Sequence, residues 1–554
     1  MTFVRVRIMT CLLSAALLLS HAQPLAAQPQ QNQPVIKLVL MIVVDQFRAE
    51  YVTRFDSLYT GGLARLFDQG FVFDKAYHNH AQTETGPGHA TLATGAYPSH
   101  HGIVANNWYD ESTGKSVYCA YDSTSTIVGH PELEGRSPVN LRLGGITDLI
   151  NRSQLASKVY SVAGKDRAAI MMAGYSADGA FWYNAKDGTI LTSLFYSAIY
   201  PKWAADFNAN RPADQYYSGI WERFAPLADY RFSGPDSVTA ESDGKDVVFP
   251  HIFSPRENDD PKVLYDNLLA TPFADHLTLR FARELMIGEG LGLDDTLDLL
   301  MIGCSAGDYV GHTYGPTSQE VEDYYLRLDH YLGEFFAFVD STVGANNYVV
   351  AMSSDHGALE LPEILQKQGV DAGRIHPDTL KAAILKSGLA VSERLGIEKN
   401  IIRRVSGGVY LNFDEAQSKG ISKPELEDLV AAELRKISYI SDAYTSDEMA
   451  ASGGSPRPYL ALYRNSYFEG RSPNVAYRLK ENYILSRDNF GTTHGSCYDY
   501  DSNVPIIFYG PQIKASRSDH RAQTVDIVPT LIEIIGLNPT DNLDGTSLYD
   551  LIKK

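Results

Sequence analysis

The chain contains 554 residues, with 67 acidic and 48 basic side chains and a formal net charge of −19. Such an acidic surface argues against nucleic acid as a partner, because clusters of Lys and Arg are what mainly hold phosphate backbones. The length and a hydrophobic fraction of 44% indicate several domains or one large α/β core with insertions. Cysteine is sparse, and Cys119, Cys304 and Cys497 allow at most one internal disulfide.

The N-terminus has the pattern of a targeting segment. Arg5 and Arg7 form a basic start, residues 8–19 are largely apolar, and small residues precede a cleavage that we place after Ala27. We therefore expect residues 1–27 to be a signal peptide and the protein to be periplasmic or secreted. No later stretch approaches the roughly 18 to 20 apolar residues of a membrane span, so no membrane anchor is expected.

The stretch from Asn79 to Gly95, NHAQTETGPGHATLATG, is predicted to end a loop and begin a helix. Residues 88–94 have a helical pattern and Gly95 is the expected stop, which places Thr85 at or just before the helix N-terminus. Unpaired backbone N–H groups and the helix dipole favour an anion there. The Thr85 hydroxyl is a candidate nucleophile, but it needs a base or a metal because its own pKa is too high.

Four apolar, β-rich runs read as strands buried on both faces of a sheet, where ligands bind at the carboxyl ends. Each run has an acidic or His side chain near it: residues 35–44 precede Asp45, residues 297–304 precede Asp308, residues 348–354 precede Asp355 and His356, and residues 504–509 follow His494. A further β-like run at residues 158–162 precedes Lys165 and Arg167.

Two helices are expected between or after these strands. The first has apolar side chains at helical spacing with Asp329 and Glu334 turned away, at Val321, Tyr325, Leu328, Leu332, Phe335 and Val339. Residues 524–537 read as the last core helix, with Asp526 in its first turn. Strand, helix and strand in this order form a right-handed crossover unit. The fold class we predict is α/β, a three-layer α/β/α core with a largely parallel central sheet.

Two regions lack this alternation of strands and helices, and we expect them to be insertions that cap the site. The second of them has short helical patterns and one expected strand at residues 408–413. The predicted organisation is core at 28–175, cap at 176–290, core at 291–360, cap at 361–480 and core at 481–554.

The side chains at the strand ends form a set typical of a metal site. Three carboxylates and three imidazoles suit two half-sites for divalent ions, zinc first among them, at Asp45, Asp308, His312, Asp355, His356 and His494. Each cation would lower the pKa of a coordinated hydroxyl or water, which is what Thr85 lacks. Two metals about 3.5–4 Å apart can hold both oxygens of an in-line phosphoryl displacement. Metal-assisted phosphoryl transfer is the leading interpretation.

These residues lie in motifs that resemble the alkaline phosphatase superfamily, and more narrowly its periplasmic, PafA-like members with a threonine nucleophile. The matching pieces run from Asp45 to Gly495: Val43-Val-Asp45, Thr85-Gly-Pro-Gly-His-Ala, Gly102-Ile-Val-Ala-Asn106, Gly164-Lys-Asp-Arg167, Asp308-Tyr-Val-Gly-His312, Ser354-Asp-His-Gly357 and Thr493-His-Gly495. The resemblance covers nearly the whole chain after residue 27.

The resemblance implies two zinc ions and a role for each site residue. One zinc would be held by Asp308, His312 and His494, and the other by Asp45, Asp355 and His356 with the Thr85 oxygen. Thr85 would attack phosphorus to form a phosphothreonine, which a zinc-bound hydroxide then hydrolyses. Asn106, Lys165 and Arg167 would contact the phosphoryl oxygens, and no magnesium is expected because Lys165 and Arg167 take its place.

Lys165 and Arg167 also separate the leading interpretation from its rivals. A monoester dianion carries charge that a diester lacks, and a Lys-x-Arg pair can neutralise it. Without the resemblance, the two would read as surface charges. The expected substrates are small phosphate monoesters. The first alternative is a diester hydrolase of the nucleotide pyrophosphatase/phosphodiesterase kind, and the second is a non-catalytic phosphate- or metal-binding protein.

Overall fold

The computed structural model describes residues 35–153, 156–216, 219–255, 260, 262–453, 456–538 and 543–554. The predicted signal peptide, residues 1–27, lies outside the described residues. Among the described helices, none is both long enough and apolar enough to cross a bilayer.

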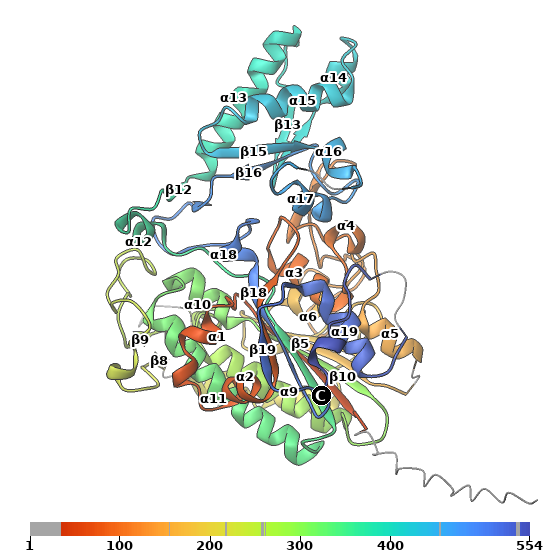
Figure 1. Ribbon diagram of the computed structural model, residues 1–554, viewed down its shortest axis with the longest axis vertical. Helices are drawn as coiled ribbons and strands as arrows, with labels where there is room; N and C mark the ends of the chain where they lie inside the picture. Colours follow the sequence, from red (N-terminus) through yellow and green to blue (C-terminus); the bar gives the residue numbers. More distant parts are fainter. Residues whose placement is uncertain are drawn as a thin grey trace, which may run out of the picture. The chain divides into compact units, whose positions relative to one another are not determined.

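A large mixed sheet forms the centre of the described chain (Figure 1). Its strands follow the order β19-β2-β18-β11-β1-β10-β5-β6-β7, with β20 paired to β2. The bounds are β1 Leu38–Val44, β2 Phe71–Tyr77, β5 Val159–Ala163, β6 Gly179–Tyr183, β7 Ile190–Leu191, β10 Asp298–Cys304, β11 Tyr348–Ser353, β18 Asn503–Tyr509, β19 Ser516–Ser518 and β20 Ala522–Gln523. The predicted α/β class is confirmed, and the four predicted buried strands correspond to β1, β10, β11 and β18.

Strand β1 needs an unbroken apolar sequence because helices cover both faces of the sheet. Its side chains alternate between two hydrophobic clusters, with Leu40 and Ile42 in one and Met41 and Val43 in the other. The first cluster includes residues of α2 Gly62–Gln69, α9 Phe273–Glu289 and α11 Gln319–Thr342. The second includes residues of α3 Thr85–Thr94, α5 Ile146–Ser153, α6 Asp166–Ala173 and α19 Ile527–Ile534. The result is a three-layer α/β/α core.

The register of the central strands brings their carboxyl ends to one edge. Strands β11, β1, β10 and β5 are neighbours and all run parallel. Val43 pairs with both Gly303 and Ser353, and Gly303 also pairs with Ala163. Four consecutive strands therefore end at about the same level, and the loops that follow them meet at the same place.

Strand β18 runs antiparallel to β11, which places the residues before it at that same edge. His494 precedes β18, so it reaches the site from the amino end of a strand, whereas Asp45, Asp308 and Asp355 follow carboxyl ends. The sheet is therefore mixed, with the parallel strands at its centre.

The predicted helix at residues 321–339 is α11, and one of its acids has an unexpected position. Asp329 is only 3% exposed, and its carboxylate accepts four backbone N–H groups at the start of α2, from Thr60, Gly61, Leu63 and Ala64. Helix periodicity indicated that Asp329 faces away from the sheet, but only the tertiary structure places α2 against that face. Asp329 satisfies N–H groups that a helix N-terminus leaves unpaired.

The predicted last core helix is shorter than expected and is divided. A 3-10 turn, η4 Thr524–Asp526, leads into α19, and a further short helix follows at α20 Tyr549–Ile552. Asp526 accepts backbone N–H groups from Gln523 and Thr546, so it caps this turn and also ties down the C-terminal segment.

Residues 176–290, expected as a cap, contribute β6, β7 and α9 to the sheet and its helical layer. The rest of this range holds short elements: α7 Lys202–Ala209, η2 Pro212–Tyr216, β8 Ile220–Trp221, η3 Leu227–Asp229, β9 His251–Ile252 and α8 Val263–Leu268. The division of the chain into core and cap segments stays a prediction.

Residues 361–480 hold a lobe with its own hydrophobic cluster, drawn in cyan and light blue in Figure 1. One strand was expected here, at β14, but the structure has a four-stranded sheet in the order β13-β14-β16-β15. The elements are α12 Pro362–Lys367, β12 Gly373–Ile375, α13 Pro377–Leu395, β13 Ile402–Val405, β14 Val409–Leu411, α14 Phe413–Gln417, α15 Lys423–Leu434, β15 Ile440–Thr445, α16 Ser446–Ala450, α17 Leu460–Ser466 and β16 Val475–Leu479.

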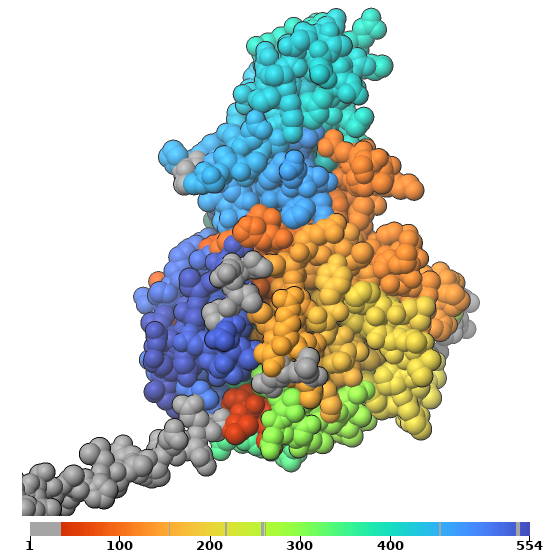
Figure 2. All heavy atoms as spheres, turned by 90° about the vertical axis from the view of Figure 1, so that its right-hand side faces the viewer, coloured from red at the N-terminus to blue at the C-terminus, as the bar shows by residue number. Residues whose placement is uncertain are grey.

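The lobe is tied to the core near α17. The Asn465 amide donates to the carbonyl oxygen of Asn79 at 2.6 Å, and the Ala81 N–H donates to Ser466 Oγ at 2.7 Å. Figure 2 shows light-blue residues of the lobe against orange residues of the core. The remaining elements are α1 Tyr51–Arg54, η1 Asp56–Leu58, α4 Pro98–His101, β3 Asn107–Asp110, β4 Lys115–Tyr118, α10 Ala306–Tyr314, β17 Tyr483–Leu485 and α18 Asp499–Ser502.

The Asp329 contacts predict a large stability effect for one side chain. Replacing Asp329 with Ala leaves four N–H groups without their buried acceptor, and we expect a loss of about 3 kcal/mol in the free energy of unfolding. The measurement is the urea-unfolding midpoint at fixed metal concentration. Glu334→Ala on the same helix, where the side chain is 54% exposed, is the matched control. Equal midpoints for the two variants would contradict the capping role.

Candidate active site

Helix α3 starts at Thr85, as the sequence predicted. Glu84 before it has an extended backbone, all ten helix residues are buried, and Gly95 ends the helix in the left-handed conformation at φ 66°. Gly88 allows the helix to approach the neighbouring loop, because a Cβ there would lie 2.4 Å from the Asp355 carbonyl oxygen. The Thr85 hydroxyl therefore sits at a helix N-terminus, against the carboxyl edge of the sheet.

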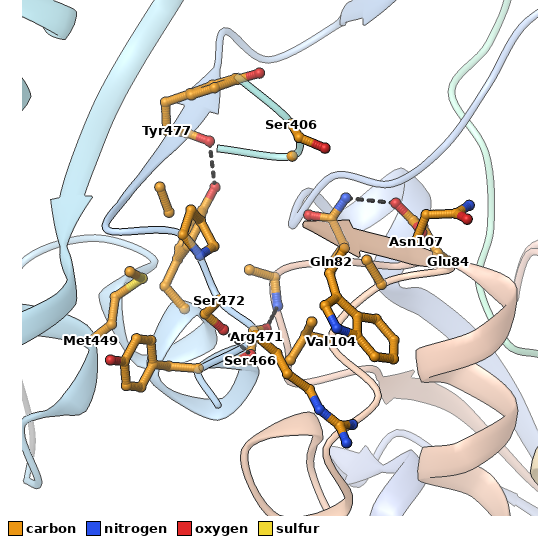
Figure 3. Close-up of a pocket in the computed structure, with 18 of the residues that line it drawn as sticks. Gln82, Glu84, Val104, Asn107, Ser406, Met449, Ser466, Arg471, Ser472 and Tyr477 are labelled. Carbon is orange, nitrogen blue, oxygen red and sulfur yellow. Dashed lines mark hydrogen bonds between the residues drawn. The ribbon is translucent and has the colours of Figure 1, made fainter. Parts of the chain in front are cut away.

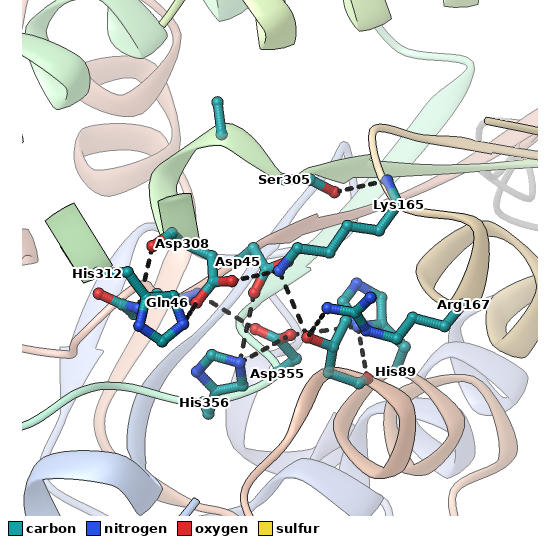
Figure 4. Close-up of polar contacts among 12 residues, drawn as sticks. Asp45, Gln46, His89, Lys165, Arg167, Ser305, Asp308, His312, Asp355 and His356 are labelled. Carbon is teal, nitrogen blue, oxygen red and sulfur yellow. Dashed lines mark hydrogen bonds and ion pairs between the residues drawn. The ribbon is translucent and has the colours of Figure 1, made fainter. Parts of the chain in front are cut away.

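Two cationic side chains converge on this hydroxyl (Figure 4). Lys165 Nζ and Arg167 Nη2 each lie 3.4 Å from Thr85 Oγ1. Lys165 follows β5 and is 3% exposed, and its ammonium also pairs with Asp45 Oδ2 at 2.6 Å and with Asp308. The two residues that could have been surface charges by sequence are placed inside the site.

The carboxylates and the lysine shift one another's pKa values. Burial raises the pKa of Asp45 well above its usual value, and the charge of Asp355 adds to the rise. Burial also acts to raise the pKa of Asp308, but the charges of His312 and Lys165 outweigh it and hold that pKa well below its usual value. For Lys165, burial acts to lower the pKa, while the Asp308 and Asp45 carboxylates raise it above its usual value. The ammonium therefore stays charged.

Asp308, His312 and His494 form one group with ligand atoms within 4.8 Å of one another. Asp308 Oδ1 lies 3.2 Å from His312 Nε2 and 3.5 Å from His494 Nε2. The Nδ1 atoms of the two rings donate at 2.7 Å to the carbonyl oxygens of Thr492 and Thr83. A carbonyl can only accept, so Nδ1 carries the proton, and a neutral ring then turns an Nε2 lone pair toward the carboxylate. That arrangement suits a shared metal ion.

A second group joins Asp45, Asp308 and His356, again with ligand atoms within 4.8 Å. Asp355 lies beside it, with Oδ2 at 3.3 Å from His356 Nε2. Three buried atoms here, Asp45 Oδ1, Asp355 Oδ2 and His356 Nε2, make no hydrogen bond with any residue that the structure describes. Buried polar atoms without partners are costly, so these residues fit a bound cation. Asp308 belongs to both groups, and the division of ligands between two ions stays a prediction.

Asn106 is held against the N-terminus of α3 through its amide oxygen. The Gly86 N–H donates to Asn106 Oδ1 at 2.7 Å, and the Asn106 N–H donates to Glu84 Oε2 at 2.6 Å. Because the amide oxygen is already bonded to the helix N-terminus, the NH₂ group is left as a donor for a ligand. Glu84 was missed by sequence analysis, and only its place directly before Thr85 could have indicated it.

Two more positioning residues emerge from the structure. Gln46, at φ 63°, donates from Nε2 to Asp308 Oδ1 at 2.8 Å and from its N–H to Asp355 Oδ1 at 3.2 Å. His89 Nδ1 lies 2.9 Å from the Thr85 carbonyl oxygen and 3.3 Å from Asp355 Oδ2. Gln46 gave no sequence signal, whereas His89 lies in the predicted helix.

The three described cysteines, Cys119, Cys304 and Cys497, are buried and free. Burial raises the pKa of the Cys119 and Cys497 thiols to about 12, which keeps both neutral. The one internal disulfide that these cysteines would allow is therefore absent from the described residues.

The sheet brings together a threonine at a helix N-terminus, two cationic side chains and two groups of candidate metal ligands. This fold and this site define a protein of the alkaline phosphatase superfamily. A model of the type I phosphodiesterase / nucleotide pyrophosphatase family matches residues 39–494. The chain belongs to this family.

Similar proteins place it more narrowly. Alkaline phosphatase PafA of Elizabethkingia meningoseptica is 33% identical over 95% of this chain and 96% of its own. Alkaline phosphatase PhoV of Synechococcus elongatus is 32% identical over 93% of each. The crystal structure of wild-type PafA has a TM-score of 0.85, covering 93% of this chain and 98% of that one. The predicted resemblance to PafA-like alkaline phosphatases is confirmed.

The double role of Asp308 predicts how metal content responds to mutation. Asp308→Asn should lower metal at both groups, because its carboxylate lies within ligand distance of both groups, whereas His494→Ala should lower it mainly at one. Metal per chain, by mass spectrometry after equilibration with zinc, should fall from about two further in the first variant than in the second. Asp499→Asn, an exposed acid nearby, is the control. Equal loss in Asp308→Asn and His494→Ala would contradict the shared position.

Proposed function

We propose that the protein hydrolyses phosphate monoesters to an alcohol and inorganic phosphate through a phosphothreonine at Thr85. Its similarity to the alkaline phosphatases PafA and PhoV over nearly the whole chain supports a phosphoric monoester hydrolase. The observation that carries the proposal is the convergence of Lys165 and Arg167 on the Thr85 hydroxyl, each at 3.4 Å. A phosphoryl group at Thr85 would meet both cations.

The proposed roles follow from what each side chain can donate or accept. Thr85 Oγ1 attacks phosphorus while the bond from phosphorus to the ester oxygen breaks and the alcohol leaves, and the α3 N-terminus favours the negative charge at Oγ1. Water then hydrolyses the phosphothreonine, which releases inorganic phosphate and regenerates the Thr85 hydroxyl. Asn106 donates an amide N–H to a phosphoryl oxygen. Lys165 and Arg167 bind the remaining oxygens, and their two charges match the dianion of a monoester better than the monoanion of a diester.

We propose two zinc ions as the cofactors, with no magnesium. Asp308, His312 and His494 would hold one, and Asp45, Asp355, His356 and the Thr85 oxygen would hold the other. When bound, the ions would lower the pKa of a coordinated hydroxyl or water and stabilise charge on the phosphoryl group. Three imidazoles among the ligands favour zinc, because magnesium prefers oxygen ligands.

We also propose a periplasmic or secreted location. Its support is the predicted signal peptide at residues 1–27, in which Arg5 and Arg7 precede an apolar run.

The nucleophile is tested by two substitutions that differ in one hydroxyl. Thr85→Ala should lower kcat/KM for a phosphate monoester on the order of 10³-fold or more, because the attacking oxygen is gone. Thr85→Ser should keep much of the activity. Acid quenching during turnover, followed by mass spectrometry, should find a phosphorylated residue 85 in the wild type and the Ser variant. Full turnover by Thr85→Ala would remove Thr85 from this role.

Substrate class is tested against the diester alternative. Replacing both Lys165 and Arg167 with Ala should lower kcat/KM for a monoester by about 10²-fold more than for a diester with the same leaving alcohol. Zinc per chain is measured in parallel, because Lys165 contacts two proposed metal ligands. Equal losses of kcat/KM for the monoester and the diester, at unchanged zinc content, would favour the nucleotide pyrophosphatase/phosphodiesterase kind of activity.

A further inference from the structure

A hollow next to Thr85 is not used by any step above. It consists of a pocket of about 220 Å³ and a second of about 360 Å³. Five residues line both pockets, so the two lie next to each other: Gln82, Glu84, Gly407, Tyr463 and Tyr477. We call the two adjacent pockets together the tyrosine cleft. Figure 3 shows part of its lining, with Tyr477 and Ser406 from the lobe and Gln82 and Glu84 from the core.

Two residues of the cleft lining, Glu84 and His494, connect the cleft with the active site. Glu84 directly precedes Thr85 and accepts the Asn106 N–H at 2.6 Å, and Asn107 lines the first pocket. His494, which belongs to one metal-ligand group, lines the second pocket. The cleft therefore adjoins the residue that precedes the nucleophile and one of the candidate metal ligands.

In-line phosphoryl transfer places the leaving oxygen opposite the nucleophile. If Thr85 lies on one side of phosphorus and the ligand group Asp308, His312 and His494 lies on the other, the alcohol portion of an ester extends toward the residues around His494. Those residues, Thr493 to Gly495, form part of the cleft. This step rests on the proposed function.

The lining of the cleft is rich in aromatic side chains. The first pocket is lined by Trp108, Tyr410, Tyr463, Tyr467 and Tyr477, and the second adds Tyr483, Tyr498 and Tyr500. Flat aromatic faces favour flat rings, which gain from stacked or edge-to-face contacts beyond the burial of area. The alcohol portion that fits such a lining carries an aromatic ring.

Tyr477 lines both pockets. The Tyr463 hydroxyl donates to the Tyr477 carbonyl oxygen at 3.2 Å, which holds Tyr477 in place. The Tyr477 hydroxyl makes no hydrogen bond with another described residue, and burial raises its pKa to about 12, so it stays a neutral donor. Beside it, the Arg478 guanidinium lies 4.4 Å from the Tyr459 ring centre and donates to the Tyr498 hydroxyl at 2.7 Å.

Hydrogen bonds between the lobe and the core involve residues that line the first pocket. Arg471 donates to the carbonyl oxygens of Gly102 and Asn140, and Ser466 Oγ accepts the Ala81 N–H. These bonds join the lobe to the core at one wall of the first pocket, so the separation of the two walls is fixed by hydrogen bonds.

We propose that the tyrosine cleft binds the alcohol portion of the substrate and favours monoesters whose alcohol carries an aromatic ring, with Tyr477 as a specificity-determining residue. The lobe at residues 361–480 thereby contributes substrate selection, while the residues of the strand ends carry out the phosphoryl transfer.

The test compares esters that differ only in the flatness of one ring. Benzyl, 2-phenylethyl and 3-phenylpropyl phosphates are each paired with their cyclohexyl analogue, and ethyl phosphate is the reference without a ring. In the metal-loaded wild type, kcat/KM should favour at least one phenyl ester over its cyclohexyl partner by about 5- to 10-fold. No preference in any pair would overturn the proposal.

Substitutions at Tyr477 then locate the preference. Tyr477→Leu should bring the phenyl-to-cyclohexyl ratio of kcat/KM to near 1, and it should lower kcat/KM for the phenyl esters more than for ethyl phosphate. Tyr477→Phe should keep the ratio. Tyr121→Leu, at a tyrosine 40% exposed outside the cleft, should leave it unchanged. If Tyr477→Leu lowers kcat/KM by the same factor for all substrates, Tyr477 has only a structural role and the assignment is overturned.

Binding separates this proposal from the proposed function. Calorimetry with 2-phenylethylphosphonate and 2-cyclohexylethylphosphonate requires no turnover. If the enzyme hydrolyses ethyl phosphate but binds both phosphonates equally, the proposed role of the cleft is refuted and the proposed phosphatase activity is not. A protein that does not hydrolyse ethyl phosphate refutes the phosphatase, while tighter binding of the phenyl compound, abolished by Tyr477→Leu, would still support the cleft.

Discussion

The structure depends on balancing negative charge at one edge of its sheet. Asp45, Asp308 and Asp355 are buried together, and two like charges 4 Å apart repel by about 4 kcal/mol at an effective dielectric constant of 20. The raised pKa of Asp45 reflects its burial and this repulsion. Lys165 and Arg167 supply part of the balance from within the chain. The buried atoms without partners indicate where further positive charge belongs.

The fold meets this requirement by aligning strand ends. Neighbouring strands β11, β1, β10 and β5 stop at the same level, and each is followed by a site residue. Helix α3 approaches from the other side because Gly88 has no side chain to keep it from the Asp355 backbone. The backbone geometry thereby holds a buried cluster of charged side chains. Hydrogen bonds of Gln46, Glu84 and His89 orient the neighbouring site residues.

The lobe at residues 361–480 adds a different function to the same edge. It has its own hydrophobic cluster and four-stranded sheet, and its aromatic side chains line a pocket together with Glu84 and His494. None of the lobe's described residues belongs to a metal-ligand group. Phosphoryl chemistry and selection of the alcohol would then reside in separate parts of the chain. Relatives that keep the strand ends could differ in substrate through this lobe alone.

The sequence determined the features that depend on local patterns. Apolar runs identified β1, β10, β11 and β18, and the Thr-Gly-Pro run with Gly95 located α3 and Thr85. Ordered motifs identified the family and the candidate ligands. The tertiary structure decided what depends on neighbours distant in sequence: that Lys165 is buried, that Asp329 caps α2, that Asp308 lies in both ligand groups, and that residues 361–480 contain a sheet. Burial and shared contacts arise only when separate strands and helices meet, so no local pattern records them.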